Sequence, residues 1–188
     1  MEYKRRRYPL FSACGLNCGL CPGYHTDAAS RCPGCGGVDF SSKHPACGVL
    51  SCCQRHGLEY CYLCGEYPCK KYENADRFDS FITHKNQMAD SGKAERIGLD
   101  AYMIEQNTKI ELLKDLLTDF NDGRRKSFFC LAVNLLDLQD IQTVMEQIQN
   151  EIKPDTTLKE KSAAIVRLFQ AMAEKRKISL HLRKKPRS

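Results

Sequence analysis

The sequence predicts a mainly α-helical protein that begins with a small, loop-rich, metal-stabilised domain. Two observations predict this architecture. Eleven of the twelve cysteines lie between Cys14 and Cys69 in short-spaced groups, whereas the later part of the chain repeats apolar residues at helical spacing. We therefore expect a zinc-knuckle or ribbon-like cysteine-rich domain at residues 12–72, a C-terminal helical bundle at residues 93–177 and a basic tail at residues 178–188.

The cysteine-rich segment, residues 12–72, is also rich in Gly, Pro and Tyr and is poor in aliphatic residues. It shows no sustained helical or alternating period, so loops and knuckles are the expected structure. A segment of this size with so few aliphatic side chains cannot bury enough apolar surface to fold alone. Bound metal must therefore supply much of its stability.

A polar connector follows at residues 73–92, with a short helix expected around Arg77–His84. Asp100 is expected to cap the next helix, which stops at the Asn-Asp-Gly turn of residues 121–123. The expected apolar face of that helix comprises Ile104, Ile110, Leu113, Leu117 and Phe120.

Three more helices are expected after this turn. Residues 126–136 are apolar on nearly all sides, as a buried central helix would be. Asp137 opens the next helix, which ends before Pro154, and Asp155 is expected to cap the last one. At residues 178–183 apolar and polar side chains alternate, which indicates one short strand.

The formal net charge of +6 is concentrated at the two ends of the chain. Basic residues outnumber acidic ones by three over residues 1–8 and by seven over residues 175–188, so the body between them is net acidic at −4. This distribution argues against a basic nucleic-acid groove on the folded surface. Two roles remain open for the basic ends: contacts to phosphate, or flexible segments that only aid solubility.

No apolar run approaches the roughly 18 residues of a membrane span, and the basic N-terminus lacks the apolar run of a secretory signal. We therefore expect a cytoplasmic protein without membrane contact, in which thiols stay reduced. In that compartment clustered cysteines are metal ligands more often than disulfides.

The spacing of four possible ligands predicts one zinc site. Structural zinc takes four Cys or His ligands, usually as two close pairs separated by a loop. Cys32-Pro-Gly-Cys35 is one such pair and His44-Pro-Ala-Cys47 is the other, with a Gly-rich loop between them. A solvated loop histidine is the alternative for His44.

Seven further cysteines stand at ligand spacing and predict at least one more site: Cys14, Cys18, Cys21, Cys52, Cys61, Cys64 and Cys69. So many unpaired thiols in a loop-rich domain would invite oxidation. A third ion would need one more ligand from Cys53, His25 or His56, and the sequence does not show which cysteines share an ion. Cys53 is the least expected ligand because it directly follows Cys52. Cys130 is expected to be a small core residue.

Four segments carry a resemblance to a known family: Cys14-Gly-Leu-Asn-Cys18-Gly-Leu-Cys21-Pro-Gly-Tyr24, Cys32-Pro-Gly-Cys35, Cys47-x4-Cys52 and Cys61-Tyr-Leu-Cys64-Gly-Glu-Tyr-Pro-Cys69. They resemble a prokaryotic cysteine-rich family catalogued as domain of unknown function 3795. The resemblance implies a metal-binding role without an assigned reaction. Family members usually carry a cysteine where His44 stands, which implies that His44 belongs to the ligand set. The segment Asn121–Cys130 resembles the helical extension of some members.

These observations predict a non-catalytic binding or interaction module that holds two or more structural zinc ions. Closed, thiolate-rich sites offer no open coordination position for a substrate. The alternative is an iron–sulfur redox protein or enzyme with a [4Fe–4S] cluster, since four-cysteine sets serve zinc and clusters alike. The partner would be another protein, or nucleic acid reached by the basic ends.

One feature outside the cysteines could bind an anion. It is a turn that leads into a helix N-terminus, where backbone N–H groups and basic side chains meet: Arg124, Arg125, Lys126 and Ser127. An ordinary capped turn with solvated basic side chains is the alternative.

Overall fold

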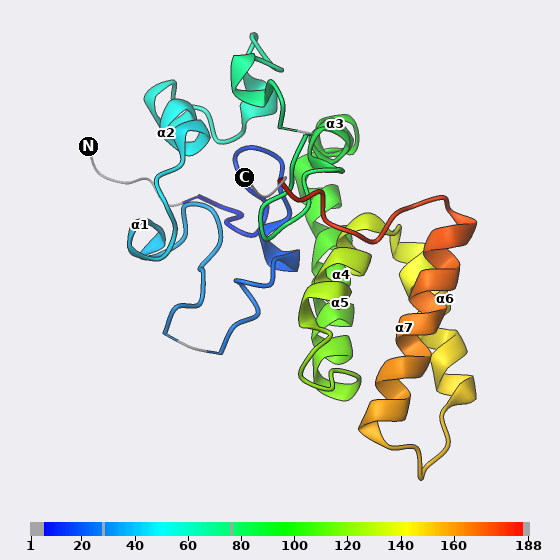
Figure 1. Ribbon diagram of the computed structural model, residues 1–188. Helices are drawn as coiled ribbons and strands as arrows, with labels where there is room; N and C mark the ends of the chain where they lie inside the picture. Colours follow the sequence, from blue (N-terminus) through cyan, green and yellow to red (C-terminus); the bar gives the residue numbers. More distant parts are fainter. Residues whose placement is uncertain (1–5, 28, 76, 186–188) are drawn as a thin grey trace. The chain divides into compact units, whose positions relative to one another are not determined.

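The computed structural model describes residues 6–27, 29–75 and 77–185 (Figure 1). Within these ranges the chain forms seven α-helices, three short 3-10 turns and no strand. The expected mainly helical fold class is confirmed. The short strand expected at residues 178–183 is wrong, because this segment runs as irregular backbone. No helix in the described ranges is long and apolar enough to cross a membrane.

The chain divides into two compact units. Unit 1 comprises Met1–Gln106 with Leu182–Ser188, and unit 2 comprises Asn107–His181. The division falls inside α4 (Leu99–Asp119), so the units do not coincide with the domain ranges expected from the sequence. Aromatic packing explains the difference. Phe11 lies 5.5 Å from Tyr60 and 4.8 Å from Tyr102 between ring centroids, which joins the start of α4 to the cysteine-rich segment.

Unit 1 contains little regular structure before α3. Its elements are the 3-10 turns Cys18–Leu20, Cys61–Leu63 and Lys70–Tyr72 and the helices α1 (Phe40–Lys43), α2 (Gly48–Arg55) and α3 (Gln87–Ile97). Loops and short turns therefore dominate the cysteine-rich segment, as its composition predicts.

The helix expected around Arg77–His84 is wrong, and α3 begins only at Gln87. The reason is a side chain that competes with the helical hydrogen-bond ladder. A carboxylate oxygen of Asp79 accepts the backbone N–H of His84 at 2.8 Å, and the Asp79 backbone N–H donates to the Arg183 carbonyl at 2.8 Å. These bonds hold the connector in turns.

Unit 2 is built from the second half of α4 with α5 (Lys126–Leu135), α6 (Leu138–Glu151) and α7 (Leu158–Lys175). Figure 1 shows α6 and α7 side by side, and they pack against each other. Fully or almost fully buried side chains form its core: Leu113, Leu116, Phe129, Leu136, Ile141, Ile148, Ile165 and Phe169. Cys130 is 2% exposed on α5, as expected for a core residue.

The sequence misplaces one residue of α4 and two helix caps. Asp100, expected to cap α4, lies in its first turn, because the helix already begins at Leu99. Ile104, expected on the apolar face, is 70% exposed, whereas its neighbour Met103 is 3% exposed. The cap of α7 is Thr157 and not Asp155. Thr157 and Glu160 form a reciprocal capping box, in which each side chain accepts a backbone N–H of the other residue.

This capping box gives a first prediction. Replacing Thr157 by Ala leaves the first turn of α7 with an unpaired N–H, which should lower the free energy of unfolding by about 1 kcal/mol. Urea unfolding followed by far-ultraviolet circular dichroism measures the change. The matched control is Asp155→Ala, for which we expect a change within about 0.5 kcal/mol. Equal effects of the two substitutions would contradict the assignment of the cap.

Candidate metal centre

Thiols form a large part of the apolar core of the cysteine-rich segment. Cys35, Cys53 and Cys61 are buried there with Ala13, Phe40 and Leu50. Cys18, Cys32 and Cys47 are partly buried and pack against the same cluster. None of the twelve cysteines, all of which lie in the described part of the chain, is in a disulfide. Sulfur therefore makes up a large part of this core, beside a few aliphatic and aromatic side chains.

Electrostatic repulsion links four of these thiols: Cys18 is close to Cys14 and Cys35, and Cys47 is close to Cys14 and Cys35. Cys21 is a further neighbour of Cys18. Burial raises the pKa of Cys18 well above its usual value, and repulsion from Cys35 and Cys14 raises it further. Burial raises the pKa of Cys35 to about 11, with added repulsion from Cys14 and Cys47. As separate thiols these groups would stay protonated, so a bound cation would be needed to hold them together as thiolates.

Backbone N–H groups point at the sulfurs of this group. Leu50 N–H donates to Cys47 Sγ at 3.5 Å. Near Cys14, Cys18 and Cys35, the backbone N–H groups of Leu16, Cys35 and Ala13 favour the thiolate form and oppose the rise in pKa that burial causes. Hydrogen bonds from N–H groups stabilise a thiolate more than a thiol. The local backbone is therefore arranged for anionic sulfur.

Two glycines bring the backbone into the required turns. Gly15, next to Cys14, has φ of 92°, and a Cβ there would lie 2.6 Å from the Gln87 carbonyl oxygen. Gly34, before Cys35, has φ of 85°, and a Cβ there would lie 2.5 Å from the Pro9 carbonyl oxygen. Only glycine fits both the dihedral angle and the space.

A buried cation lies against the same cluster. Arg6 is 8% exposed, and its guanidinium lies 4.5 Å from the centroid of the Tyr60 ring. Nη1 donates to the carbonyl oxygens of Phe11 at 2.8 Å and Cys35 at 3.3 Å, whereas Nε and Nη2 are buried with no hydrogen-bond partner. The positive charge of Arg6 lowers the pKa of both Cys35 and Cys53. At Cys35 the effect of burial is larger, so the pKa is raised overall. At Cys53 the hydrogen bond with Cys61 and burial together have the larger effect and also raise the pKa. Sequence reasoning missed Arg6 because it lies outside the cysteine pattern.

A second group of donors lines one cavity of about 420 Å³: Cys52, Cys53, His56, Cys61, Cys64 and Cys69. Cys53 Sγ lies 3.4 Å from Cys61 Sγ. A hydrogen bond from the Cys53 thiol lowers the pKa of Cys61 to about 6 and raises that of Cys53. The sequence placed Cys53 last among the ligands, yet the fold brings it beside Cys61, eight residues away.

The sulfur–sulfur distance in this pair fits a shared metal better than a disulfide. In a tetrahedral zinc site with Zn–S bonds of about 2.3 Å, two sulfurs lie about 3.8 Å apart. A disulfide bond is about 2.0 Å long. His56 completes this side of the cavity, where its Nδ1–H donates to the Cys52 carbonyl oxygen at 2.9 Å and lies 3.8 Å from Cys52 Sγ.

The remaining expected ligands belong to neither thiol group, although Cys32 packs against the same core and Cys21 is close to Cys18. Cys21 and Cys32 flank Gly23, whose N–H donates to Cys21 Sγ at 3.4 Å. The His44 ring stacks on Phe40 at 4.6 Å between centroids, and its Nδ1–H donates to the Pro45 carbonyl oxygen at 2.8 Å. His25 Nε2–H donates to the Gly19 carbonyl oxygen at 2.7 Å. The grouping of Cys32, Cys35, His44 and Cys47 stays a prediction, and it is an alternative to the group of Cys14, Cys18, Cys35 and Cys47 because both use Cys35 and Cys47.

No group of three or more His, Cys, Asp or Glu side chains is ready-made for a metal ion among residues 6–27, 29–75 and 77–185. Neither thiol group therefore forms a closed ligand shell in this arrangement of the side chains. Rotation of cysteine side chains between their staggered rotamers changes sulfur positions without moving the backbone.

The expected anion turn already uses several of its N–H groups. Asn121 Oδ1 accepts the N–H groups of Gly123 at 3.2 Å and Arg125 at 3.1 Å, and Asp122 Oδ1 accepts the N–H of Arg124 at 3.1 Å. These bonds are those of a self-capped turn. Anion binding by Arg124, Arg125, Lys126 and Ser127 stays a prediction that would need to use the side chains.

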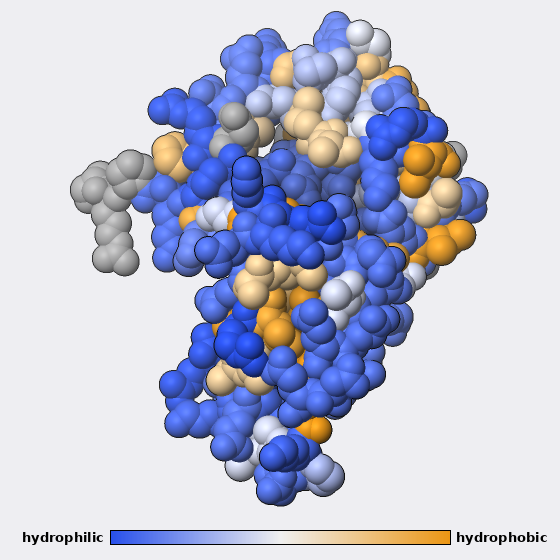
Figure 2. Space-filling view, turned by 90° about the vertical axis from the view of Figure 1, so that its right-hand side faces the viewer, coloured by the Kyte–Doolittle hydropathy of each residue, from blue (hydrophilic) through white to orange (hydrophobic). Residues whose placement is uncertain are grey.

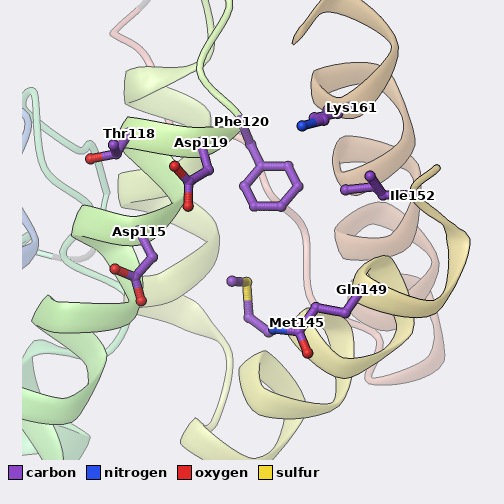
Figure 3. A pocket seen from close by; sticks show the side chains of 8 residues that line it. All are labelled: Asp115, Thr118, Asp119, Phe120, Met145, Gln149, Ile152 and Lys161. Atoms are coloured by element: carbon purple, nitrogen blue, oxygen red, sulfur yellow. The ribbon is translucent and has the colours of Figure 1, made fainter. Parts of the chain in front are cut away.

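Unit 2 has a cavity of its own, of about 470 Å³ (Figure 3). The Phe120 ring lies between side chains from α4 and Lys161 of α7, with Met145 and Gln149 of α6 below it. Asp115 and Asp119 face Lys161 across this space, so opposite charges line it. No cysteine or histidine is among its described lining residues.

Figure 2 shows a face of the molecule on which hydrophilic residues predominate and hydrophobic ones form separate patches.

Comparison with known families agrees with the cysteine pattern. Residues 10–74 match a family model described as "Protein of unknown function (DUF3795)". The matched segment contains both thiol groups, and Arg6 precedes it. Searches of curated proteins and of solved structures gave no match. The resemblance expected from the sequence is confirmed for this segment, and its description names no metal or reaction.

Proposed function

We propose that unit 1 is a zinc-binding module in which Cys14, Cys18, Cys35 and Cys47 hold one structural ion. The observation that carries this proposal is Arg6. Burying an arginine without an anion is very unfavourable, and two of its nitrogens have no partner. Four thiolates around a divalent ion leave a net charge of −2, which supplies the missing negative charge beside Arg6.

The residues of this group fit zinc in their chemistry. All four donors are soft sulfurs, which zinc prefers in closed structural sites. Backbone N–H groups already stabilise their thiolate forms, and Gly15 and Gly34 allow the turns on which Cys14 and Cys35 lie. Bound zinc would pull the four side chains together and complete a core that has few aliphatic residues.

A second ion would use the cavity lined by Cys53, Cys61, Cys64 and Cys69, with Cys52 and His56 as further donors. Two ions in one small segment agree with the count of two or more expected from the sequence. Four-thiolate sites have no open position for a substrate, so the proposed role of the metal is structural and the module is non-catalytic. Its partner would be a protein, or nucleic acid contacted by basic residues at the chain ends.

One observation favours a second candidate, an iron–sulfur cluster at this second group. Six donors surround a cavity of about 420 Å³, which exceeds what one four-coordinate ion requires. A [4Fe–4S] cluster needs four cysteine thiolates around a larger inorganic core. In that case unit 1 would carry a redox-active centre.

Metal content tests both candidates. Protein purified without oxygen should be colourless and contain two zinc ions per chain by elemental analysis. Cys18→Ala should lose close to one ion per chain, whereas the matched thiol deletion Cys130→Ala in unit 2 should lose none. A brown protein with equal amounts of iron and sulfide would support the iron–sulfur candidate instead. Protein that binds neither metal would contradict both.

The role of Arg6 has its own test on the same protein. Arg6→Met keeps the apolar stem and removes the charge, so zinc affinity measured by competition with a chelator should fall by about 10- to 100-fold. Arg6→Lys keeps a positive charge and should recover most of the affinity. Equal zinc affinity of the Met variant and the wild type would show that Arg6 does not balance thiolate charge.

A further inference from the structure

We propose that a pocket of about 350 Å³ in unit 1, beside Cys14, binds a small organic anion with an apolar body. The pocket lies within the size range of small-molecule sites. Its walls come from four separated parts of the chain: the turn after Cys14, α2, the connector up to Gln87, and Lys185 of the C-terminal segment. This inference goes beyond metal binding, because it rests on the pocket lining alone.

The charge of the lining selects an anion. Lys71 and Lys185 both line the pocket, and no carboxylate does so among its described lining residues. One of these lysines comes from the net-acidic body of the chain and the other from the basic C-terminal segment, and together they give the pocket lining a positive charge. Lysine ammonium groups bind phosphates and carboxylates as point charges.

The rest of the lining selects an apolar body for this anion. Leu16, Val49 and Phe78 line the pocket and cannot hydrogen-bond a polar ligand. Tyr72 adds an aromatic ring, while its hydroxyl donates to the Cys14 carbonyl oxygen at 3.3 Å. Burial of apolar ligand surface against such side chains supplies affinity, and the lysines supply orientation.

The polar lining is held in place by contacts of its own. Gln87 Nε2 donates to the Cys14 carbonyl oxygen at 2.9 Å, and His84 Nδ1–H donates to the Ala75 carbonyl oxygen at 3.1 Å. These bonds fix the pocket wall on the side of Cys14 and on the side of the connector. A wall that is fixed before binding loses less entropy when the ligand binds.

The C-terminal wall is also anchored. Arg183 donates two side-chain hydrogen bonds to Asp79, at 2.7 Å and 3.3 Å, and its backbone N–H donates to the same carboxylate at 2.8 Å. The Asp79 side chain is fully buried. We call this contact the Asp79–Arg183 clasp. It places the C-terminal segment at the pocket, two residues before Lys185.

Two fluorescent probes with the same kind of apolar body test the proposal on the purified, metal-containing full chain. Anilinonaphthalene sulfonate is anionic, and N-phenylnaphthylamine is uncharged. We expect the anionic probe to bind at least about tenfold more tightly than the neutral one. Lys71→Gln/Lys185→Gln should weaken binding of the anionic probe by about tenfold, because it removes two charge-assisted contacts.

Matched variants locate the site. The control variant Lys70→Gln/Lys184→Gln removes two lysines from the same two segments, but neither residue lines this pocket. This variant should therefore bind the anionic probe as tightly as the wild type does. Lys185→Gln alone should weaken the anionic probe, because Lys185 does not line the neighbouring cysteine cavity whereas Lys71 does. Equal binding of both probes, or an equal loss in the pocket double variant and the control double variant, would overturn the proposal.

Discussion

Removal of bound metal is expected to abolish the tyrosine near-ultraviolet circular dichroism of this protein and to leave most of its helical far-ultraviolet signal. All eight tyrosines lie at or before Tyr102 and there is no tryptophan, so the tyrosine signal reports on unit 1 alone. The cysteine-rich core contains three buried cysteines among six buried residues, and the proposed metal ions would supply much of its cohesion. The core of unit 2 is aliphatic and aromatic and contains no proposed ligand.

A strong zinc chelator added to the purified full chain makes this measurement, and excess zinc should restore the tyrosine signal. Cys35→Ser should weaken the signal before any chelator is added, whereas Cys130→Ala should retain it. Loss of most helical signal together with the tyrosine signal would contradict independent stability of unit 2. An unchanged tyrosine signal in protein shown to be metal-free would contradict a structural role of the metal.

The helices of unit 2 could be predicted because their determinants are local. The apolar spacing along α4, α6 and α7 and the apolar run of α5 are visible in any short window of sequence. The prediction failed at α3, whose buried residues Gln87 and Ser91 are polar. Their partners lie far away in sequence, as in the bond from Gln87 to Cys14, 73 residues apart. No local pattern encodes such a contact.

The metal-binding prediction shows the same limit. Cysteine spacing identified the candidate ligands. It could group only cysteines that are close in sequence, whereas the fold brings together cysteines that are far apart in sequence. Cys14 and Cys47 belong to one group although a loop of about thirty residues separates them. Arg6 and the Asp79–Arg183 clasp were missed for the same reason, since each contact spans distant parts of the chain.

Breaking the Asp79–Arg183 clasp should have the second large effect. Arg183→Met leaves a fully buried carboxylate without its cation, so we expect the free energy of unfolding of unit 1 to fall by about 3 kcal/mol. Urea unfolding followed by the tyrosine signal measures this loss. The matched control is Arg7→Met, whose ion pair with Asp100 is 64% and 65% exposed and should contribute less than about 1 kcal/mol.

The pH dependence of the clasp follows from the pKa of Asp79. Burial alone would raise this pKa, but the bonds from Arg183 and from the N–H groups of Arg183 and His84 lower it to about 2. An unfolded aspartate has a pKa of about 3.9. The clasp therefore contributes its full stability, roughly 2 kcal/mol, above about pH 4, and this contribution is lost as the pH falls from about 4 to about 2.

Acid also releases bound metal, but it does so in the wild type and in a variant without the Asp79 charge alike. Comparing the unfolding free energies of these two proteins therefore isolates the effect of Asp79. The difference in unfolding free energy between wild type and Asp79→Asn should therefore shrink as the pH falls below about 4. Hydrogen exchange gives a local readout, because the Asp79 N–H donates to the Arg183 carbonyl oxygen at 2.8 Å and should exchange faster in Arg183→Met. If the clasp also positions Lys185, Arg183→Met should weaken the anionic probe as Lys185→Gln does. Faster exchange with unchanged probe binding would show that the clasp stabilises the C-terminal segment without shaping the pocket.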